Sequence, residues 1–281
     1  MRIIHNPQEL QDAALPWRFS GLKTALVPTM GYLHAGHESL LRKAREMGDR
    51  VIISLFVNPS QFGPNEDLAS YPRDFERDSE RARALGVDIL FAPDASAMYA
   101  PDYGTWIDVP EMADTLCGKS RPGHFRGVCT VVNKLFMLTL PTFALFGEKD
   151  WQQLAVLRRM TRDLNIPVTI LGCPTVREES GLALSSRNAY LTPEEYAMAP
   201  QLHAGLRLAK KMADEGEENV ARLDTAVREF WKAALPLGGV DYLAFVDPDS
   251  LAPLERITGP ALVAAAVRLG KARLIDNLLL R

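Results

Sequence analysis

Short apolar runs alternate with amphipathic helical patterns from residue 23 to residue 171 of this chain. The apolar runs have the length of buried strands and lie at residues 23–27, 50–57, 87–93, 142–146 and 167–171. Helical patterns separate them at about residues 38–47, 73–85, 127–140 and 150–164. Continuous apolar strands connected by helices are typical of a parallel sheet covered on both faces. The sequence therefore predicts a doubly wound, Rossmann-like α/β domain.

The pattern changes beyond Val176. A polar loop leads to two predicted helices, at about residues 193–214 and 220–234, and then to strands near residues 242–246 and 261–267. We therefore expect two domains: an α/β domain of residues 1–176 and a smaller α+β domain of residues 177–281. Residues 94–122 are rich in Pro, Gly and Asp, and we expect them to be irregular.

Composition excludes several classes of protein. The 281 residues carry a formal net charge of −3, which gives no general reason to expect a nucleic-acid or membrane partner. The N-terminus lacks the apolar segment of a signal peptide, and no apolar run is long enough to span a membrane. Three cysteines, Cys117, Cys129 and Cys173, are far apart and form no metal-binding or disulfide pattern. We expect a cytoplasmic protein with reduced thiols.

A pair of histidines follows the first predicted strand. His34 and His37 flank Gly36, just before the helix predicted over residues 38–47. The N-terminus of a helix carries unpaired N–H groups and a positive partial charge, so it attracts anions. We expect a phosphate site here, with Gly36 allowing a phosphate to approach the backbone. The alternative is that both histidines are polar loop or capping residues.

Three further polar loops complete the candidate site, two of them after predicted strands. They are residues 58–65, 147–153 and 181–188, and they contain Gln61, Lys149 with Asp150, and Ser185-Ser186-Arg187. Ligands of open α/β sheets bind outside the carboxyl ends of the strands. Each loop also has a simpler interpretation: Gln61 closes a turn, Lys149 with Asp150 forms a helix start, and the two serines cap a local turn. Their joint occurrence favours a binding site.

Other motifs of nucleotide and hydrolytic enzymes are missing. Gly118-Lys119-Ser120 has the end of a phosphate-binding P-loop, but Ala113 stands where its first glycine is required. The chain contains no Gly-x-Gly-x-x-Gly after a strand, no Gly-x-Ser-x-Gly and no His-Glu-x-x-His. In the helix over residues 73–85 the acidic residues are expected to form a solvated face, with Asp78 as a candidate contact for a nucleotide-bound Mg²⁺.

The ordered set of motifs resembles the pantothenate synthetases, which are pantoate–β-alanine ligases. The resemblance covers nearly the whole chain and rests on these residues: Pro28-Thr29-Met30-Gly31, His34-x-Gly36-His37, Phe56-Val57-Asn58-Pro59, Gln61-Phe62, Tyr71-Pro72-Arg73, Arg121-Pro122-Gly123-His124-Phe125, Phe146-Gly147-Glu148-Lys149-Asp150, Gln152-Gln153, Leu184-Ser185-Ser186-Arg187-Asn188 and Leu274-Ile275-Asp276-Asn277. Two positions depart from the family pattern. Ser60 replaces the usual Met, and Cys117 replaces a frequent Glu.

The resemblance implies a two-step reaction. The pantoate carboxylate attacks the α-phosphorus of ATP to give pantoyl adenylate and pyrophosphate, and the amine of β-alanine then displaces AMP. It implies that His37, His34 and Lys149 are catalytic and that Gln61 and Gln153 bind pantoate, with Gln61 also near β-alanine. The implied ATP contacts are Met30, Gly31, His34, His37, Gly147, Glu148, Lys149, Asp150, Val176, Leu184, Ser185, Ser186 and Arg187.

The resemblance also implies Mg²⁺ bound with ATP, a homodimer, and closure of the smaller domain over the active site. The family assigns His37 as proton donor, but at neutral pH an imidazole can donate either a hydrogen bond or a proton. Two other classes stay open at this point. A related adenylyltransferase would need a cationic acceptor pocket at Gln61 and Gln153, and a non-enzymatic nucleotide-binding module would not need both phosphate loops.

Overall fold

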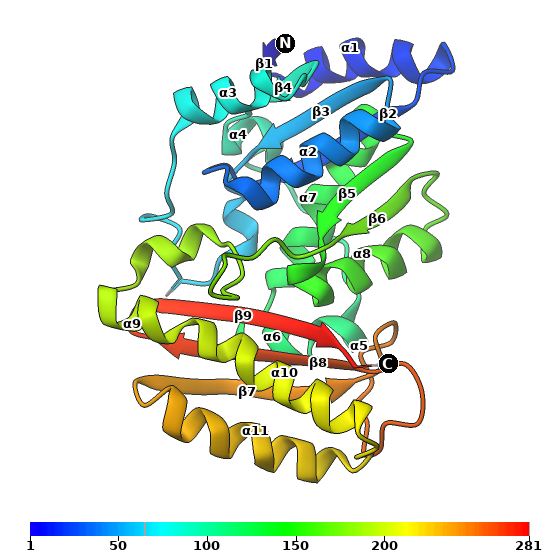
Figure 1. Ribbon diagram of the computed structural model, residues 1–281. Coiled ribbons are helices and arrows are strands. Elements are labelled where there is room, and N and C mark those ends of the chain that lie inside the picture. The colour runs from blue at the N-terminus through cyan, green and yellow to red at the C-terminus, as the bar shows by residue number, and fades with distance from the viewer. Residues whose placement is uncertain (65, 281) are drawn as a thin grey trace.

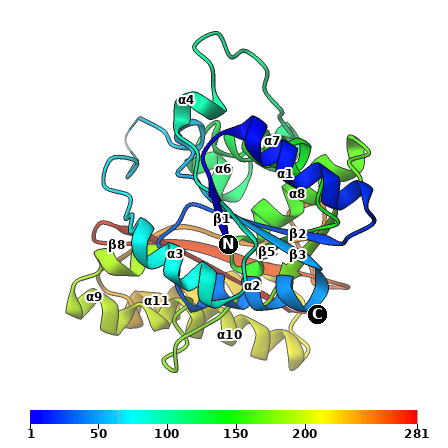
Figure 2. The same ribbon diagram turned by 90° about the horizontal axis from the view of Figure 1, so that it is seen from above.

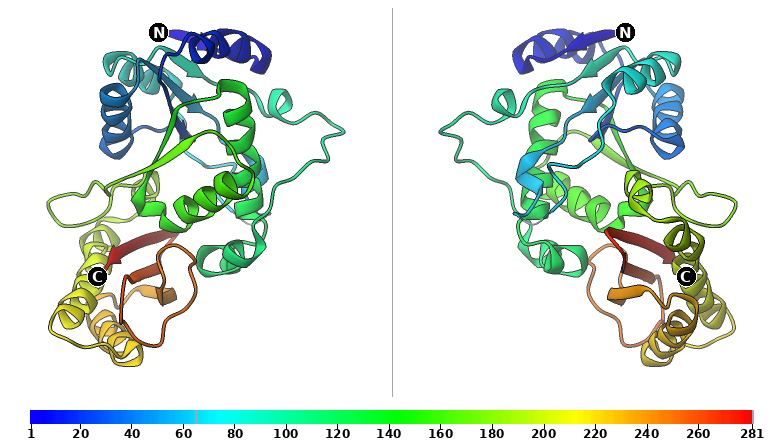
Figure 3. Two further views of the ribbon diagram at one scale, coloured as in Figure 1. Left: turned by 90° about the vertical axis from the view of Figure 1, so that its right-hand side faces the viewer. Right: turned by 90° about the vertical axis from the view of Figure 1, so that its left-hand side faces the viewer.

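A computed structural model describes residues 1–64 and 66–280. Two sheets form the framework, a six-stranded parallel sheet and a three-stranded antiparallel sheet (Figure 1). Figure 3 shows them as successive layers, with the smaller sheet and its helices below the larger one. None of the helices in the described ranges combines the length and apolar character needed to cross a bilayer.

The elements follow one another in the order expected for repeated strand–helix units, followed by an α+β unit. The larger sheet contains β1 (Arg2–Ile4), β2 (Thr24–Thr29), β3 (Arg50–Leu55), β4 (Ile89–Phe91), β5 (Phe143–Gly147) and β6 (Thr169–Cys173). Its long helices are α1 (Pro7–Phe19), α2 (Ala35–Met47), α3 (Phe75–Ala84), α7 (His124–Thr139) and α8 (Trp151–Asp163). The short helices α4 (Ala95–Met98), α5 (Pro110–Ala113) and α6 (Leu116–Ser120) lie between β4 and α7. The C-terminal unit contains α9 (Pro193–Met198), α10 (Pro200–Asp214), α11 (Val220–Ala234), β7 (Gly238–Val246), β8 (Leu262–Leu269) and β9 (Ala272–Leu279).

Helices cover both faces of the six-stranded sheet, which confirms the predicted doubly wound class. Side chains alternate along a strand, so a strand with two buried faces is apolar at every position. On β2, Ala25 and Val27 pack in the core under α2 and α3, whereas Leu26 packs with α1, α7 and α8. In the view from above, the same two groups of helices lie on opposite sides of the sheet (Figure 2).

The order of the strands creates one switch point. The sheet runs β1-β4-β3-β2-β5-β6, so successive connections move outward from β2 in one direction and from β5 in the other. Loops leaving β2 and β5 therefore diverge to opposite faces and open a crevice at the carboxyl ends of these strands. The site lies at this crevice.

The two faces of the smaller sheet pack into two different hydrophobic cores. On β8, Val263 and Ala265 pack against α10 and α11, whereas Leu262 and Ala264 join the core that contains α7 and α8. The six strands of the large sheet end at Cys173, which is close to the predicted boundary at residues 176 and 177. The two units therefore share a core across that boundary.

Several local predictions differ from the structure. Residues 94–122, expected to be irregular, contain α4, α5 and α6. The single helix expected over residues 193–214 is two helices, because Pro200 supplies no N–H to continue the first one. The residue pattern did not predict β1, α1 or β9, and β9 is the strand of the small sheet that carries Asp276 and Asn277.

Candidate active site

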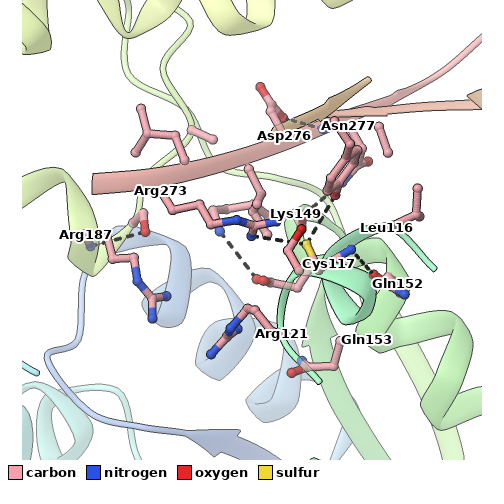
Figure 4. Close-up of a pocket in the computed structure, with 18 of the residues that line it drawn as sticks. Leu116, Cys117, Arg121, Lys149, Gln152, Gln153, Arg187, Arg273, Asp276 and Asn277 are labelled. Carbon is pink, nitrogen blue, oxygen red and sulfur yellow. Dashed lines mark hydrogen bonds and ion pairs between the residues drawn. The ribbon is translucent and has the colours of Figure 1, made fainter. Parts of the chain in front are cut away.

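Two adjoining cavities lie between the carboxyl ends of the parallel strands and the small sheet. The inner cavity, about 230 Å³, contacts the ends of β2 and β5, and the outer one, about 740 Å³, extends to β8 and β9. They share a wall that includes Arg121, Lys149, Gln153, Ser185 and Arg187. Figure 4 shows Arg121, Lys149, Gln153 and Arg187 reaching this region from different elements. Residues far apart in the chain are thus brought to one site.

The two histidines form the start of α2. His34 is the residue that caps the helix: its Nδ1 accepts a hydrogen bond from the Gly36 N–H at 3.1 Å, and the His34 N–H donates to His37 Nδ1 at 3.3 Å. The ring centroids are 4.1 Å apart. Both residues line the inner cavity. Each ring uses one nitrogen at the start of the helix, so the capping interpretation leaves the other nitrogen free for the predicted site role.

Hydrogen bonding and burial determine the protonation of both rings. Burial, followed by the charge of Lys149, lowers the pKa of His34 to about 4. Burial, followed by electrostatic repulsion from His34 and Lys149, lowers the pKa of His37 to about 3. Each ring is therefore neutral at pH 7, and since Nδ1 accepts a backbone N–H, the ring proton resides on Nε2. The pair presents neutral N–H donors to its surroundings.

These lowered pKa values predict a loss of stability at mildly acidic pH. Below pH 6.5 the unfolded chain protonates His37 and the folded protein does not, so stability is complete above about pH 6.5 and declines as the pH falls toward about 3. The decline is at most about 1.4 kcal/mol per pH unit for one histidine. Denaturant unfolding of the wild type and His37→Asn at about pH 7 and about pH 5 measures it. The variant should lose less stability, and equal losses would contradict the expectation.

Gly36 is required by the His34 ring. A Cβ at position 36 would lie 2.9 Å from both Cε1 and Nδ1 of His34, too close for any side chain. The predicted purpose of Gly36 was to let a phosphate approach the backbone. In the structure it makes room for the imidazole that caps the helix.

Asp78 supports the loop before the histidines. Its two carboxylate oxygens accept hydrogen bonds from the Tyr32 N–H at 2.6 Å and the Leu33 N–H at 2.7 Å. Gly31 has a φ of +84°, and a Cβ there would lie 3.1 Å from Oδ2 of the same carboxylate, so a larger residue would crowd it. Asp78 lines neither cavity. The carboxylate thus supports the backbone of the loop before His34, and a magnesium contact at Asp78 stays a prediction.

Gln61 is held by a compact turn between β3 and α3. Its side-chain oxygen accepts a hydrogen bond from Asn58 Nδ2 at 3.2 Å, and its amide contacts Met30 Sδ at 2.9 Å. A Cβ at Gly127 would lie 2.4 Å from the Ser60 carbonyl oxygen, so α7 can approach this turn only with glycine. Gln61 and Met30 both line the inner cavity. Ser60, one of the two departures from the family pattern, bonds through its hydroxyl to Asn58.

Lys149 lies on the opposite wall, in the 3₁₀ turn Glu148–Asp150 that follows β5. Its ammonium is 3.5 Å from the Asp150 carboxylate, and both residues line the two cavities. Glu148 lines neither cavity, because its side chain lies beside Gly172. Of this turn, Lys149 and Asp150 can contact a ligand directly through their side chains.

Two arginines of the wall shared by the two cavities are paired with carboxylates. Arg187 makes two hydrogen bonds to Asp67, at 3.0 and 3.2 Å, and Arg121 forms a bidentate ion pair with Glu66. His124 Nε2 accepts from Arg121, and its Nδ1–H donates to the Gln61 carbonyl oxygen at 2.8 Å. Arg121 and His124 belong to the family motif at residues 121–125, but no site role was predicted for them. They lie in a Pro-Gly turn before a helix, where no hydrophobic periodicity points to a site. The family motif was the one signal that indicated this segment.

Neighbouring glutamines have different surroundings. Gln152 is buried and ties α8 to the α5–α6 segment: its oxygen accepts from the Cys117 N–H at 2.9 Å, and its amide donates to the Thr115 carbonyl at 2.7 Å. Gln153 lines both cavities, and its side chain has no hydrogen-bond partner among the described residues. The helix thus uses one glutamine for packing and presents the next to the cavities.

The structure brings most of the predicted residues to one place. The predicted residues that line the inner cavity are Met30, His34, His37, Gln61, Gly147, Lys149, Asp150, Gln153, Val176, Leu184, Ser185, Ser186 and Arg187. The Leu184 N–H donates to the Val176 carbonyl at 3.0 Å, so these two residues lie together. Gly31, Glu148 and Asp78 are the exceptions. Of the predicted residue 58–65 segment, Asn65 lies outside the described residues.

The fold and the cavity define a doubly wound α/β protein with a ligand site at the switch point of its sheet. A family model described as pantoate-beta-alanine ligase matches residues 2–279, so the chain belongs to the pantoate–β-alanine ligase family and is an enzyme of the ligase class. It is 61% identical over 280 residues to the pantothenate synthetase of Oleidesulfovibrio alaskensis, with 100% of both chains covered.

Solved structures agree with this assignment. The crystal structure of pantothenate synthetase from Thermus thermophilus is similar with a TM-score of 0.94, at 48% identity and 99% coverage of both chains. The pantoate-beta-alanine ligase of Francisella tularensis, crystallised with beta-gamma ATP and beta-alanine, has a TM-score of 0.81 at 35% identity. That comparison covers 99% of this chain and 97% of the other.

Proposed function

We propose that the protein condenses pantoate with β-alanine in an ATP-dependent reaction that passes through pantoyl adenylate. The family name and the ligands of the Francisella tularensis ligase support ATP and β-alanine as substrates. The observation that carries the intermediate is the meeting, in one cavity, of the His34–His37 pair and Lys149 with the amides of Gln61 and Gln153. The phosphates of ATP and the polar groups of pantoate would thus be bound next to each other, as formation of the adenylate requires.

The first half-reaction makes use of the cationic and N–H groups. When the pantoate carboxylate attacks the α-phosphorus, negative charge grows on the phosphoryl oxygens and on the departing pyrophosphate. Neutral Nε2–H donors of His34 and His37, together with the Lys149 ammonium, stabilise that charge from fixed positions. With pKa values of about 4 and 3, the histidines donate hydrogen bonds rather than protons in this role.

The remaining loops close the site. Ser185, Ser186 and Arg187 approach the β and γ phosphates, and Val176 and Leu184 bind adenine through their backbone groups. Arg187 is paired with Asp67, so a contact of its guanidinium with a phosphate would exchange one anion for another. Closure of the C-terminal unit would keep water from the acyl adenylate until the β-alanine amine attacks it, with Gln61 nearby.

Asp78 lies outside both cavities and both of its oxygens already accept backbone N–H groups, which argues against Asp78 as the magnesium ligand. Within residues 1–64 and 66–280, no cluster of three or more His, Cys, Asp or Glu side chains is arranged to hold a metal. We propose that magnesium enters with the phosphates of ATP.

The family resemblance also supports a homodimer, which sedimentation of the purified protein would test.

Exchange of labelled pyrophosphate into ATP tests the proposed reaction. The exchange should require pantoate, and adding β-alanine should then yield the amide product and AMP. A related adenylyltransferase would instead exchange pyrophosphate with a phosphorylated acceptor, and a binding module would bind ATP without any exchange. Folded protein that shows no pantoate-dependent exchange in the presence of magnesium would defeat the proposal.

The two neighbouring glutamines provide an internal comparison for the pantoate site. Gln153→Ala should raise the KM for pantoate more than the KM for ATP, with little change in stability. The expected loss of hydrogen-bonding free energy to pantoate is about 1–3 kcal/mol. Gln152→Ala should instead lower the free energy of unfolding, because it leaves the buried Cys117 N–H without an acceptor and removes the bond from the Gln152 amide to the Thr115 carbonyl. Steady-state kinetics and denaturant unfolding of both variants give the comparison. Equal changes in both KM values for Gln153→Ala would contradict its assignment.

A further inference from the structure

The motif Leu274-Ile275-Asp276-Asn277 belongs to none of the loops assigned above. It lies on β9, the strand of the small sheet nearest the large one (Figure 1). Asp276 and Asn277 are both buried, with 3% and 8% exposure, yet both line the outer cavity. Buried polar side chains on a strand need partners, so their bonds reveal what the motif does.

Asn277 bonds to the turn that carries Lys149. Its side-chain amide donates to the Glu148 carbonyl at 2.9 Å and to the Lys149 carbonyl at 2.8 Å. Both amide hydrogens are therefore used on two consecutive carbonyl groups of one 3₁₀ turn, which fixes the backbone from which the lysine side chain extends (Figure 4).

Asp276 bonds to the segment after β6. Its carboxylate forms a bidentate pair with Arg177, at 2.7 and 2.8 Å, and lies 3.3 Å from His203 Nδ1. Burial by itself would raise the pKa of this carboxyl, but the bonds from His203 and Arg177 outweigh it and lower the pKa. Arg177 directly follows Val176, so adjacent residues of β9 hold the loops after β5 and β6.

We propose that Asn277 is a positioning residue for Lys149. Together with Asp276, it lets strand β9 set the spacing between the phosphate-binding lysine and the loop of Val176. The idea rests on the proposed function, because it assigns Lys149 to the phosphates of ATP. It predicts that Asn277 acts on the rate through Lys149 and not through general stability.

The test is a double-mutant cycle in pantoate-dependent pyrophosphate exchange. Asn277→Asp keeps the shape of the side chain but points an oxygen at two carbonyl groups, and Asn277→Ala removes the group without adding repulsion. Each should lower kcat by about 10- to 100-fold, the scale of a displaced catalytic group, with the KM for pantoate nearly unchanged. In a Lys149→Ala background the same changes should cost less than about twofold.

Asn219→Ala serves as the control for stability, since it removes the cap of α11 away from both cavities. It should reduce thermal stability and leave kcat unchanged. An Asn277 variant that keeps the wild-type kcat, or that loses the same factor with and without Lys149, would overturn the proposal. Wild-type protein without exchange activity would instead count against the proposed function, which keeps the two failures distinct.

Discussion

Replacing His37 with alanine is expected to lower the turnover of pantoate-dependent pyrophosphate exchange by about 100-fold or more, the effect of losing one transition-state donor. The expectation follows from the neutral state of the ring, whose Nδ1 accepts the His34 N–H and whose Nε2–H remains available to the phosphates. Steady-state measurement of kcat and of both KM values, with circular dichroism to check folding, gives the result.

Two conservative variants separate the roles of the His37 ring nitrogens. Asparagine can replace Nδ1 as the acceptor for the His34 N–H but places no donor at the position of Nε2. Glutamine reaches the Nε2 position with an N–H donor. We expect His37→Asn to fold and remain poorly active, and His37→Gln to recover part of the lost rate. Near-normal turnover of folded His37→Ala would rule out the catalytic role.

Asp78→Asn is expected to destabilise the protein by about 3 kcal/mol, without any metal being present. The carboxylate accepts the N–H groups of Tyr32 and Leu33, and an amide can accept only one of them while directing its own N–H at the other. Since this loop leads directly to His34, activity should fall as well. Denaturant unfolding in the presence of a chelator measures the loss of stability.

Asp74→Asn is the matched control on the same helix. Asp74 caps α3 by accepting the Arg77 N–H at 3.2 Å, and asparagine caps a helix about as well as aspartate. Its stability should therefore stay close to that of the wild type. If Asp78→Asn were equally stable and changed only the magnesium requirement, Asp78 would be a metal contact after all.

The parts of the fold with strong apolar periodicity were predictable. The strands β2 to β6 and the helices α2, α3, α7 and α8 all appear within a few residues of their predicted positions. β9 was not predicted, because Asp276 and Asn277 interrupt its apolar pattern. These two polar residues bond to the loops that contain Lys149 and Val176. Contacts between segments so far apart in the chain cannot be read from a local sequence pattern.

The site was predictable to the extent that its residues follow strand ends. The carboxyl ends of parallel strands meet at one edge, so His34, Gln61 and Lys149 were expected together and do line one cavity. Glu148 and Asp78 show the limit of that reasoning. Neither side chain lines a cavity: Glu148 lies beside Gly172, and Asp78 accepts the N–H groups of Tyr32 and Leu33.

The class of fold, the order of its units and the family could be predicted from the residues alone, because hydrophobic periodicity and the order of motifs are present in the chain before it folds. The use of individual polar groups follows from the packing of distant segments. Asp78 bonds to the backbone of a loop, Gln152 packs in the interior while Gln153 lines the cavities, and burial keeps both histidines neutral. These outcomes depend on burial and on partners distant in the chain, and both arise only when the strands and loops are packed together.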